Sequence, residues 1–222
     1  MATGEAYNVI LVDWSGPAGA DVDAAARSSV LVGDYVGRVL NRLVQARGLR
    51  PDDLVVVGHS MGGHVAGVVG NRVGVGSGAP AEVVALDPAN GLYDANPLED
   101  QLDISDAKFV QVIHTNGGGA GQLESKGHAD FFPNGGSSQV GCGVLAEIFG
   151  CSHNRASTYY IESIISKDFV ATRCSSYEDF SQGKCSSNEH AVMGEWSPLG
   201  LSGTYYLNTN AKAPFAQGQT DL

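Results

Sequence analysis

Short apolar runs separated by longer amphipathic stretches form the dominant pattern along the chain. Runs typical of strands occur at 7–14 (YNVILVDW), 53–57 (DLVVV), 82–87 (EVVALD), 108–114 (KFVQVIH) and 203–209 (GTYYLNT). The 53–57 run lacks the alternation of a half-exposed strand. We therefore expect it to be covered on both faces, as in a parallel sheet.

Three stretches between these runs have helical periodicity. Residues 23–47 place an apolar stripe on one side, made of Val32, Val36, Val39, Leu40 and Leu43. Gly48 and Pro51 end this helix. A second helix follows Ser60 and has a face of small residues, and a third is expected at 153–165. Strands that alternate with helices predict one α/β domain with a mostly parallel sheet, with a loop-rich stretch at 115–141.

The segment LVVVGHSMGGH (54–64) places Ser60 between glycines, after an apolar strand and before a helix. With 30 glycines in 222 residues, the G-x-S-x-G pattern has little meaning without its context. The strand–turn–helix context is that of a nucleophile elbow, in which a sharp turn exposes the serine hydroxyl above the sheet edge. The alternative is a purely structural turn.

A serine nucleophile needs a base and an acid, which follow it in chain order in sheets of this kind. Asp87 ends the next strand, in ALDPAN, and is the candidate acid. His153, in CSHNR, comes late in the chain at the start of a helix and is the candidate base. His190 is the runner-up for the base. The backbone N–H of Met61 is the expected oxyanion donor, because it follows the nucleophile.

Charge and cysteine content narrow the function classes. The net charge of −11 argues against a partner such as nucleic acid that is held by positive charge. Cys142 and Cys151 form one close pair in sequence, and Cys174 and Cys185 form another. These pairs suggest two short-range disulfides and an oxidising compartment, with four free thiols as the alternative. The start of the chain, MATGEAYN, lacks the features of a signal peptide.

Several longer segments carry a family resemblance. They include VVVGHSMGGHVAG, ALDPA, SDAKFVQVIHTN, GHADFFPNGG, CSHNRASTYYIESI and FVATRCSSYEDFSQGKC, and they cover nearly the whole chain in family order. The chain resembles the pancreatic-lipase family of secreted animal lipases and phospholipases A1. The resemblance implies an α/β-hydrolase fold, hydrolysis of lipid esters at an interface without a cofactor, and secretion. It also implies the triad Ser60, Asp87 and His153 and the disulfides Cys142–Cys151 and Cys174–Cys185.

Some members of this family bind calcium after the acid strand, where this chain has Asp103 and Asp106. Two carboxylates are few for a cation that takes six to eight oxygen ligands, so we expect no metal site. The flap between Cys142 and Cys151 is short (GVLAEIFG), which favours phospholipase A1 or mixed lipase activity. The runner-up is a plain triacylglycerol lipase. A non-lipid esterase and a non-catalytic, yolk-type lipid-binding relative are further alternatives.

Two regions of the family pattern have no counterpart in the sequence. These are the strand with a His-Gly-rich loop that precedes 7–14, and the C-terminal β-sandwich domain. The first region would supply the second oxyanion donor. We therefore expect residues 1–222 to be a single, N-terminally incomplete lipase domain that is poorly soluble and weakly active by itself.

Overall fold

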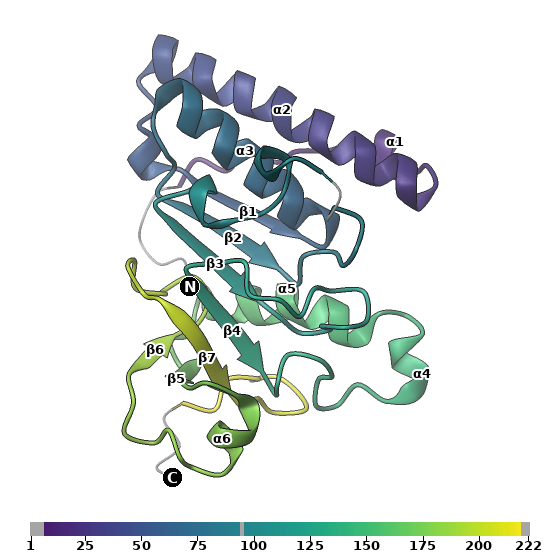
Figure 1. The fold of residues 1–222 in the computed structure, drawn as a ribbon, viewed down its shortest axis with the longest axis vertical. Coiled ribbons are helices and arrows are strands. Elements are labelled where there is room, and N and C mark those ends of the chain that lie inside the picture. The colour runs from purple at the N-terminus through teal and green to yellow at the C-terminus, as the bar shows by residue number, and fades with distance from the viewer. Residues whose placement is uncertain (1–6, 94–95, 219–222) are drawn as a thin grey trace.

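The computed structural model describes residues 7–93 and 96–218, which form a sheet with helices on both faces (Figure 1). The helices are α1 (Ser15–Ala18), α2 (Val22–Arg47), α3 (Met61–Ser77), α4 (Val144–Glu147), α5 (Cys151–Ser163) and α6 (Tyr177–Ser181). The strands are β1 (Val55–His59), β2 (Glu82–Leu86), β3 (Phe109–Ile113), β4 (Ala129–Pro133), β5 (Val170–Arg173), β6 (His190–Val192) and β7 (Gly203–Leu207). Short 3₁₀ turns occur at Pro51–Asp53, Leu98–Asp100 and Ile104–Asp106.

The seven strands lie in the order β1-β2-β3-β4-β7-β5-β6. Strands β1 to β4 and β7 are parallel, whereas β5 pairs antiparallel with β7 and with β6. The mostly parallel sheet of an α/β fold is therefore confirmed. Because β1 and β2 are parallel neighbours, the residues that follow them, Ser60 and Asp87, emerge at the same edge of the sheet.

Alternating side chains of the strands build two separate cores. Val83 and Ala85 of β2 pack with Ala66 of α3 on one face. Val84 and Leu86, their neighbours along the strand, belong to the cluster on the other face, which contains residues of α5. This period-two alternation explains why α2 and α3 lie on one side of the sheet in Figure 1 and α5 on the other.

Helix α2 confirms the predicted amphipathic helix, with an Asp21 side chain that accepts from the Ala24 N–H and a left-handed Gly48 at its end. Glycines of α2 let it lie close to α3, since a Cβ added to Gly33 would meet Val68 and one added to Gly37 would meet Arg72. Val39, expected on the buried stripe, is 37% exposed. Across the described residues, no helix is both long and apolar enough to cross a bilayer.

Two expectations at the sheet edge are wrong. Residues 7–14 do not form a strand, and most of their side chains are exposed. A strand requires a neighbour for its backbone groups, and β1 has β2 as its one ladder partner within the described ranges. The expectation that 53–57 is covered on both faces also fails: the strand runs from Val55 to His59, and Val55 and Val57 are 47% and 45% exposed.

The C-terminal half contains elements that the sequence pattern did not reveal. Strand β4 (ADFFP) lies inside the stretch expected to be loop. Strands β5 and β6 form the antiparallel end of the sheet, and α6 lies between them in the chain. Cys142 is bonded to Cys151 and Cys174 to Cys185, as the resemblance implied. The first disulfide joins the segment before α4 to the first residue of α5, and the second packs among buried aromatic residues.

Candidate active site

Ser60 occupies a strained turn between β1 and α3. Its φ of 58° and ψ of −125° lie outside the regions that non-glycine residues normally adopt. Its N–H donates to the Leu86 carbonyl at 3.0 Å, and its carbonyl accepts from the Ala89 N–H at 3.2 Å. A Cβ on Gly58 would collide with the Gly62 backbone, so a glycine is needed for the tight turn. The serine backbone is thereby tied to the residues on either side of Asp87.

Asp87 follows β2 directly and has no solvent exposure. Its φ is 44°, a second positive value at this sheet edge. One carboxylate oxygen accepts from the backbone N–H groups of Thr115 and Asn116 at 2.7 and 2.9 Å. The loop at 115–122, here called the glycine-rich loop, closes tightly over the carboxylate, because a Cβ on Gly121 would overlap it. These contacts orient the other oxygen towards α5.

His153 lies in the first turn of α5, two residues after the disulfide-bonded Cys151. Its Nδ1 is 2.6 Å from Asp87 Oδ2, and its side chain is 14% exposed. A carboxylate can only accept, so Nδ1 carries the proton and Nε2 of the neutral ring is left as a base. The structure therefore joins the candidate base and acid directly.

The other histidines have different positions. His190, the runner-up base, is exposed on β6, where its Nδ1 lies 3.1 Å from Thr172 Oγ1. β6 is at the opposite end of the sheet from β1 and β2, which carry Ser60 and Asp87. His64 packs on Tyr93 with a ring separation of 3.6 Å, and His128 accepts from the Val110 N–H. Neither of these two contacts reaches Asp87.

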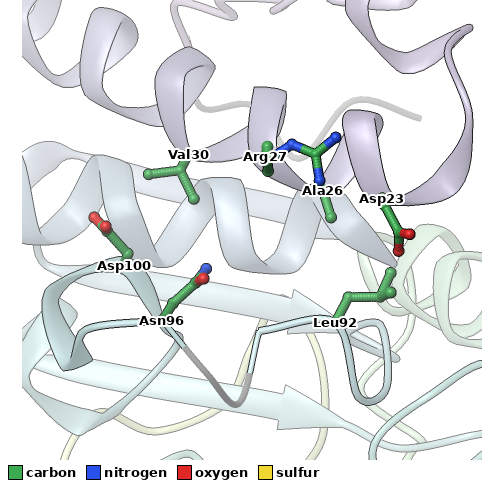
Figure 2. Close-up of a pocket in the computed structure, with 7 residues that line it drawn as sticks. All are labelled: Asp23, Ala26, Arg27, Val30, Leu92, Asn96 and Asp100. Carbon is green, nitrogen blue, oxygen red and sulfur yellow. The ribbon is translucent and has the colours of Figure 1, made fainter.

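Met61, the candidate oxyanion donor, is the first residue of α3. The first N–H groups of a helix have no acceptor within the helix, so the Met61 N–H is available to a ligand. The Met61 side chain packs with Val30 and Leu92 against a small cluster under α2. Beside this cluster is a pocket of about 390 Å³. In Figure 2, α2 lines it with Asp23, Ala26, Arg27 and Val30, and the loop after β2 lines it with Leu92, Asn96 and Asp100.

Asp103 and Asp106 have structural contacts at the end of that loop. Asp103 accepts from the Ser105 N–H, and Asp106 accepts from the Asp103 N–H, which together make a capping box. Burial raises the pKa of Asp106 to about 7. In the part of the chain that the structure describes, no three His, Cys, Asp or Glu side chains gather around a point that would suit a metal ion. That no metal is required stays a prediction.

The short disulfide loop before α5 exposes apolar side chains next to the candidate base. Val144, Leu145, Ile148 and Phe149 have exposed fractions between 73% and 86%. We call these four residues the apolar lip. Since α5 begins at Cys151, the lip directly precedes the helix turn that carries His153.

One residue at this edge was missed by the sequence reasoning. His59, which directly precedes Ser60, has its Nε2 3.0 Å from the backbone carbonyl of His153. Strand periodicity could have found it, because His59 shares a face of β1 with Val55 and Val57, opposite Val56. Val56 packs towards α2 and α3, so His59 faces α5.

Known proteins resemble this chain over most of its length. The family model described as Lipase matches residues 1–215. The chain belongs to the lipase family. Among its relatives, the pancreatic triacylglycerol lipase of Oryctolagus cuniculus is 35% identical over an alignment of 243 residues. The alignment covers 96% of this chain and 52% of the relative. Lipase member H-B of Xenopus laevis is 37% identical over 187 residues, covering 82% of this chain and 40% of the relative.

This lipase-family chain thus spans about half the length of the curated relatives that it matches. Lipase member H of Xenopus tropicalis follows the same pattern, with 39% identity over 81% of this chain and 39% of its own length. The expected family is confirmed, and with it the α/β-hydrolase type of fold. The elbow at Ser60 and the Asp87–His153 pair lie within the matched residues.

Proposed function

We propose that this protein is a secreted carboxylic-ester hydrolase that cleaves fatty-acyl esters of lipids with a Ser60–His153–Asp87 triad. The observation that carries the proposal is the strained Ser60 turn, whose backbone is hydrogen-bonded to the residues flanking Asp87, together with the 2.6 Å contact from Asp87 to His153. Membership of the lipase family supports the same reaction class.

In the proposed mechanism, Ser60 Oγ attacks the acyl carbonyl carbon while His153 Nε2 takes its proton. The Met61 N–H donates to the oxyanion of the tetrahedral intermediate. The intermediate collapses as the protonated His153 gives its proton to the leaving alcohol, so an acyl-serine forms. A water molecule, deprotonated by His153, then releases the fatty acid. Asp87 fixes the ring and stabilises its cation throughout, and no cofactor takes part.

The apolar lip supports a substrate at a lipid surface. Four large apolar side chains exposed within one short loop are costly in water and suit contact with lipid. A loop closed by Cys142 and Cys151 has little reach, since even eight fully helical residues span about 12 Å. It is therefore suited to be a fixed rim rather than a large lid. We propose phospholipase A1 or mixed lipase activity on this basis.

Triacylglycerol hydrolysis is the second candidate. It is favoured by the names of several relatives, which are pancreatic triacylglycerol lipases. Secretion is part of the proposal because the two disulfides suit an oxidising compartment. We also propose that residues 1–222 act as one lipase domain, because the cores on both faces share the sheet that holds Ser60 and Asp87.

Covalent labelling tests the proposal. A fluorophosphonate probe should modify Ser60, identified by mass spectrometry of the labelled peptide, and Ser60→Ala should abolish both labelling and ester hydrolysis. His153→Ala removes the general base and should therefore lower the labelling rate by roughly 10²- to 10⁴-fold. The matched control His190→Ala should change little. Substantial hydrolysis by Ser60→Ala would reject the mechanism, and a folded protein that never labels would favour the non-catalytic, lipid-binding alternative.

A further inference from the structure

The side chain of His59 bridges β1 and the first turn of α5. Its Nε2 lies 3.0 Å from the carbonyl oxygen of His153, and its ring centroid is 4.5 Å from that of the His153 ring, at an interplanar angle of 42°. Hence the residue immediately before the proposed nucleophile contacts the proposed base. This contact is to the backbone of His153, whereas Asp87 holds its ring.

The protonation state of His59 follows from its surroundings. Burial lowers its pKa, and the groups that face it are His153 from α5 and Asp87 at the end of β2. At neutral pH the ring is therefore uncharged and has one N–H. Because the His153 carbonyl can only accept, that proton lies on Nε2, and His59 is the donor of this hydrogen bond.

We propose that His59 is a positioning residue, which sets the distance between the base and the nucleophile by holding the first turn of α5 to the end of β1. The inference rests on the proposed function and assigns a further residue to the same reaction. Of two adjacent residues, His59 then positions the base and Ser60 supplies the nucleophile. Because β1 and β2 are paired, a movement of α5 relative to β1 would displace the His153 imidazole from Ser60 and disturb its hydrogen bond to Asp87.

Two substitutions separate the hydrogen bond from the bulk of the ring. His59→Phe keeps an aromatic ring against His153 but removes the donor. His59→Gln places an amide N–H close to the position of Nε2 and so restores the donor. If His59→Phe does not fold, His59→Asn, whose shorter amide does not reach the His153 carbonyl, replaces it.

The measurements are kcat and KM on a short soluble ester and the rate of fluorophosphonate labelling of Ser60, with thermal unfolding to establish that each full-length variant is folded. A misplaced base should lower kcat and the labelling rate by roughly 10- to 100-fold while KM changes little. His59→Gln should recover most of that loss. A residue that merely fills space would give the opposite order, with His59→Phe the more active variant.

The inference is overturned if folded His59→Phe keeps the wild-type kcat, or if folded His59→Gln is as slow as His59→Phe. Either result with an inactive Ser60→Ala would leave the proposed mechanism standing and reject the role of His59 alone. Activity retained in Ser60→Ala would instead reject the mechanism, and the role of His59 with it.

Discussion

His114 and Asp130 form a buried pair under the glycine-rich loop, with Nε2 and Oδ1 2.8 Å apart and side-chain exposures of 0% and 2%. The other ring nitrogen of His114 lies 2.8 Å from the Gln122 carbonyl. Carboxylate and carbonyl both accept hydrogen bonds, so each ring nitrogen of His114 faces an acceptor. The pair anchors the loop whose residues Thr115, Asn116 and Gly121 enclose Asp87.

Removing one member of this pair should be strongly destabilising. His114→Phe leaves the Asp130 charge buried, with the Lys126 and Gly127 N–H groups as its other donors, and should lower the free energy of unfolding by about 3–5 kcal/mol. His114→Phe combined with Asp130→Leu should cost less than His114→Phe alone, because no charge is then stranded. Urea unfolding at pH 7 measures both variants.

The pair of exposed Glu124 and partly buried Lys126, with Nζ and Oε2 3.7 Å apart, provides the control. Glu124→Gln should change the free energy of unfolding by about 0–1 kcal/mol. Equal losses from the single and double substitutions at His114 and Asp130 would contradict the interpretation that the loss comes from a buried Asp130 carboxylate left without its partner.

Glu82 should make the protein less stable as the pH rises. Burial raises its pKa from 4.5 to about 7, with the nearby Glu195 acting in the same direction and the hydrogen bond from Gln111 opposing both. Between these pH values the folded state binds more protons than the unfolded state, so the free energy of unfolding falls as the pH increases from about 4.5 to about 7 and then levels off.

Glu82→Gln keeps the acceptor for Gln111 and removes the charge. It should match the wild type near pH 4 and exceed it at pH 8 by on the order of 1 to 3 kcal/mol in urea unfolding. Asp106, whose pKa burial raises in the same way, should leave part of the pH dependence in place. A gain that is equal at both pH values would refute the titration of Glu82 as its cause, and Glu124→Gln serves as the exposed control.

The two disulfides should differ in what their removal affects. Cys142→Ser/Cys151→Ser frees the start of α5, two residues before His153, and should lower kcat on a soluble ester by roughly tenfold or more, since misplacing a reacting group is costly. The double variant Cys174→Ser/Cys185→Ser alters the cluster with Phe132, Phe180 and Tyr206, which contains neither Asp87 nor His153. It should lower the unfolding free energy by about 2–4 kcal/mol and leave kcat largely unchanged. The reverse pattern would argue against a link between the first disulfide and the base.

The apolar lip should matter for lipid surfaces alone. Leu145→Ser/Phe149→Ser removes two exposed apolar side chains and should reduce hydrolysis of phospholipid vesicles by roughly tenfold, because burial of each such side chain contributes about 1.5–3 kcal/mol at most. Hydrolysis of a short soluble ester should be unaffected. Ile165→Ser, also exposed but two residues beyond the far end of α5, is the matched control. A steep rate increase at the solubility limit of a triglyceride, without phospholipid cleavage, would favour the triacylglycerol lipase alternative.

Local pattern and chain order predicted the part of the fold where contacts are local. The β1–α3–β2 unit follows from apolar runs around a glycine-flanked serine, and chain order selected Asp87 and His153, which are hydrogen-bonded. The prediction of a strand at 7–14 was wrong. The side chains of this segment favour a strand, but ladder formation depends on a neighbour, which no local pattern encodes.

The contacts that the sequence did not reveal are between distant segments. β4 was missed because ADFFP is a short apolar run within a glycine-rich stretch, and its pairing with β3 and β7 defines it. The contact from His59 to His153 likewise joins residues 94 positions apart. Such contacts depend on the packing of whole elements, so single-residue preferences do not predict them.

The pairing of β4 with β7 has a consequence for the order in which the protein folds. The chain between these parallel neighbours contains α5, β5, β6 and both disulfides, whereas β1, β2 and β3 are joined by shorter connections. Closing the longer connection costs more chain entropy and is slower. Ser60 and Asp87 belong to the half of the sheet that can assemble early. Helix α5 packs on β2 but also on β3, β4 and β7, so its cluster is complete only after the slow closure. During refolding, helical circular dichroism should therefore recover before the fluorophosphonate labelling proposed for Ser60.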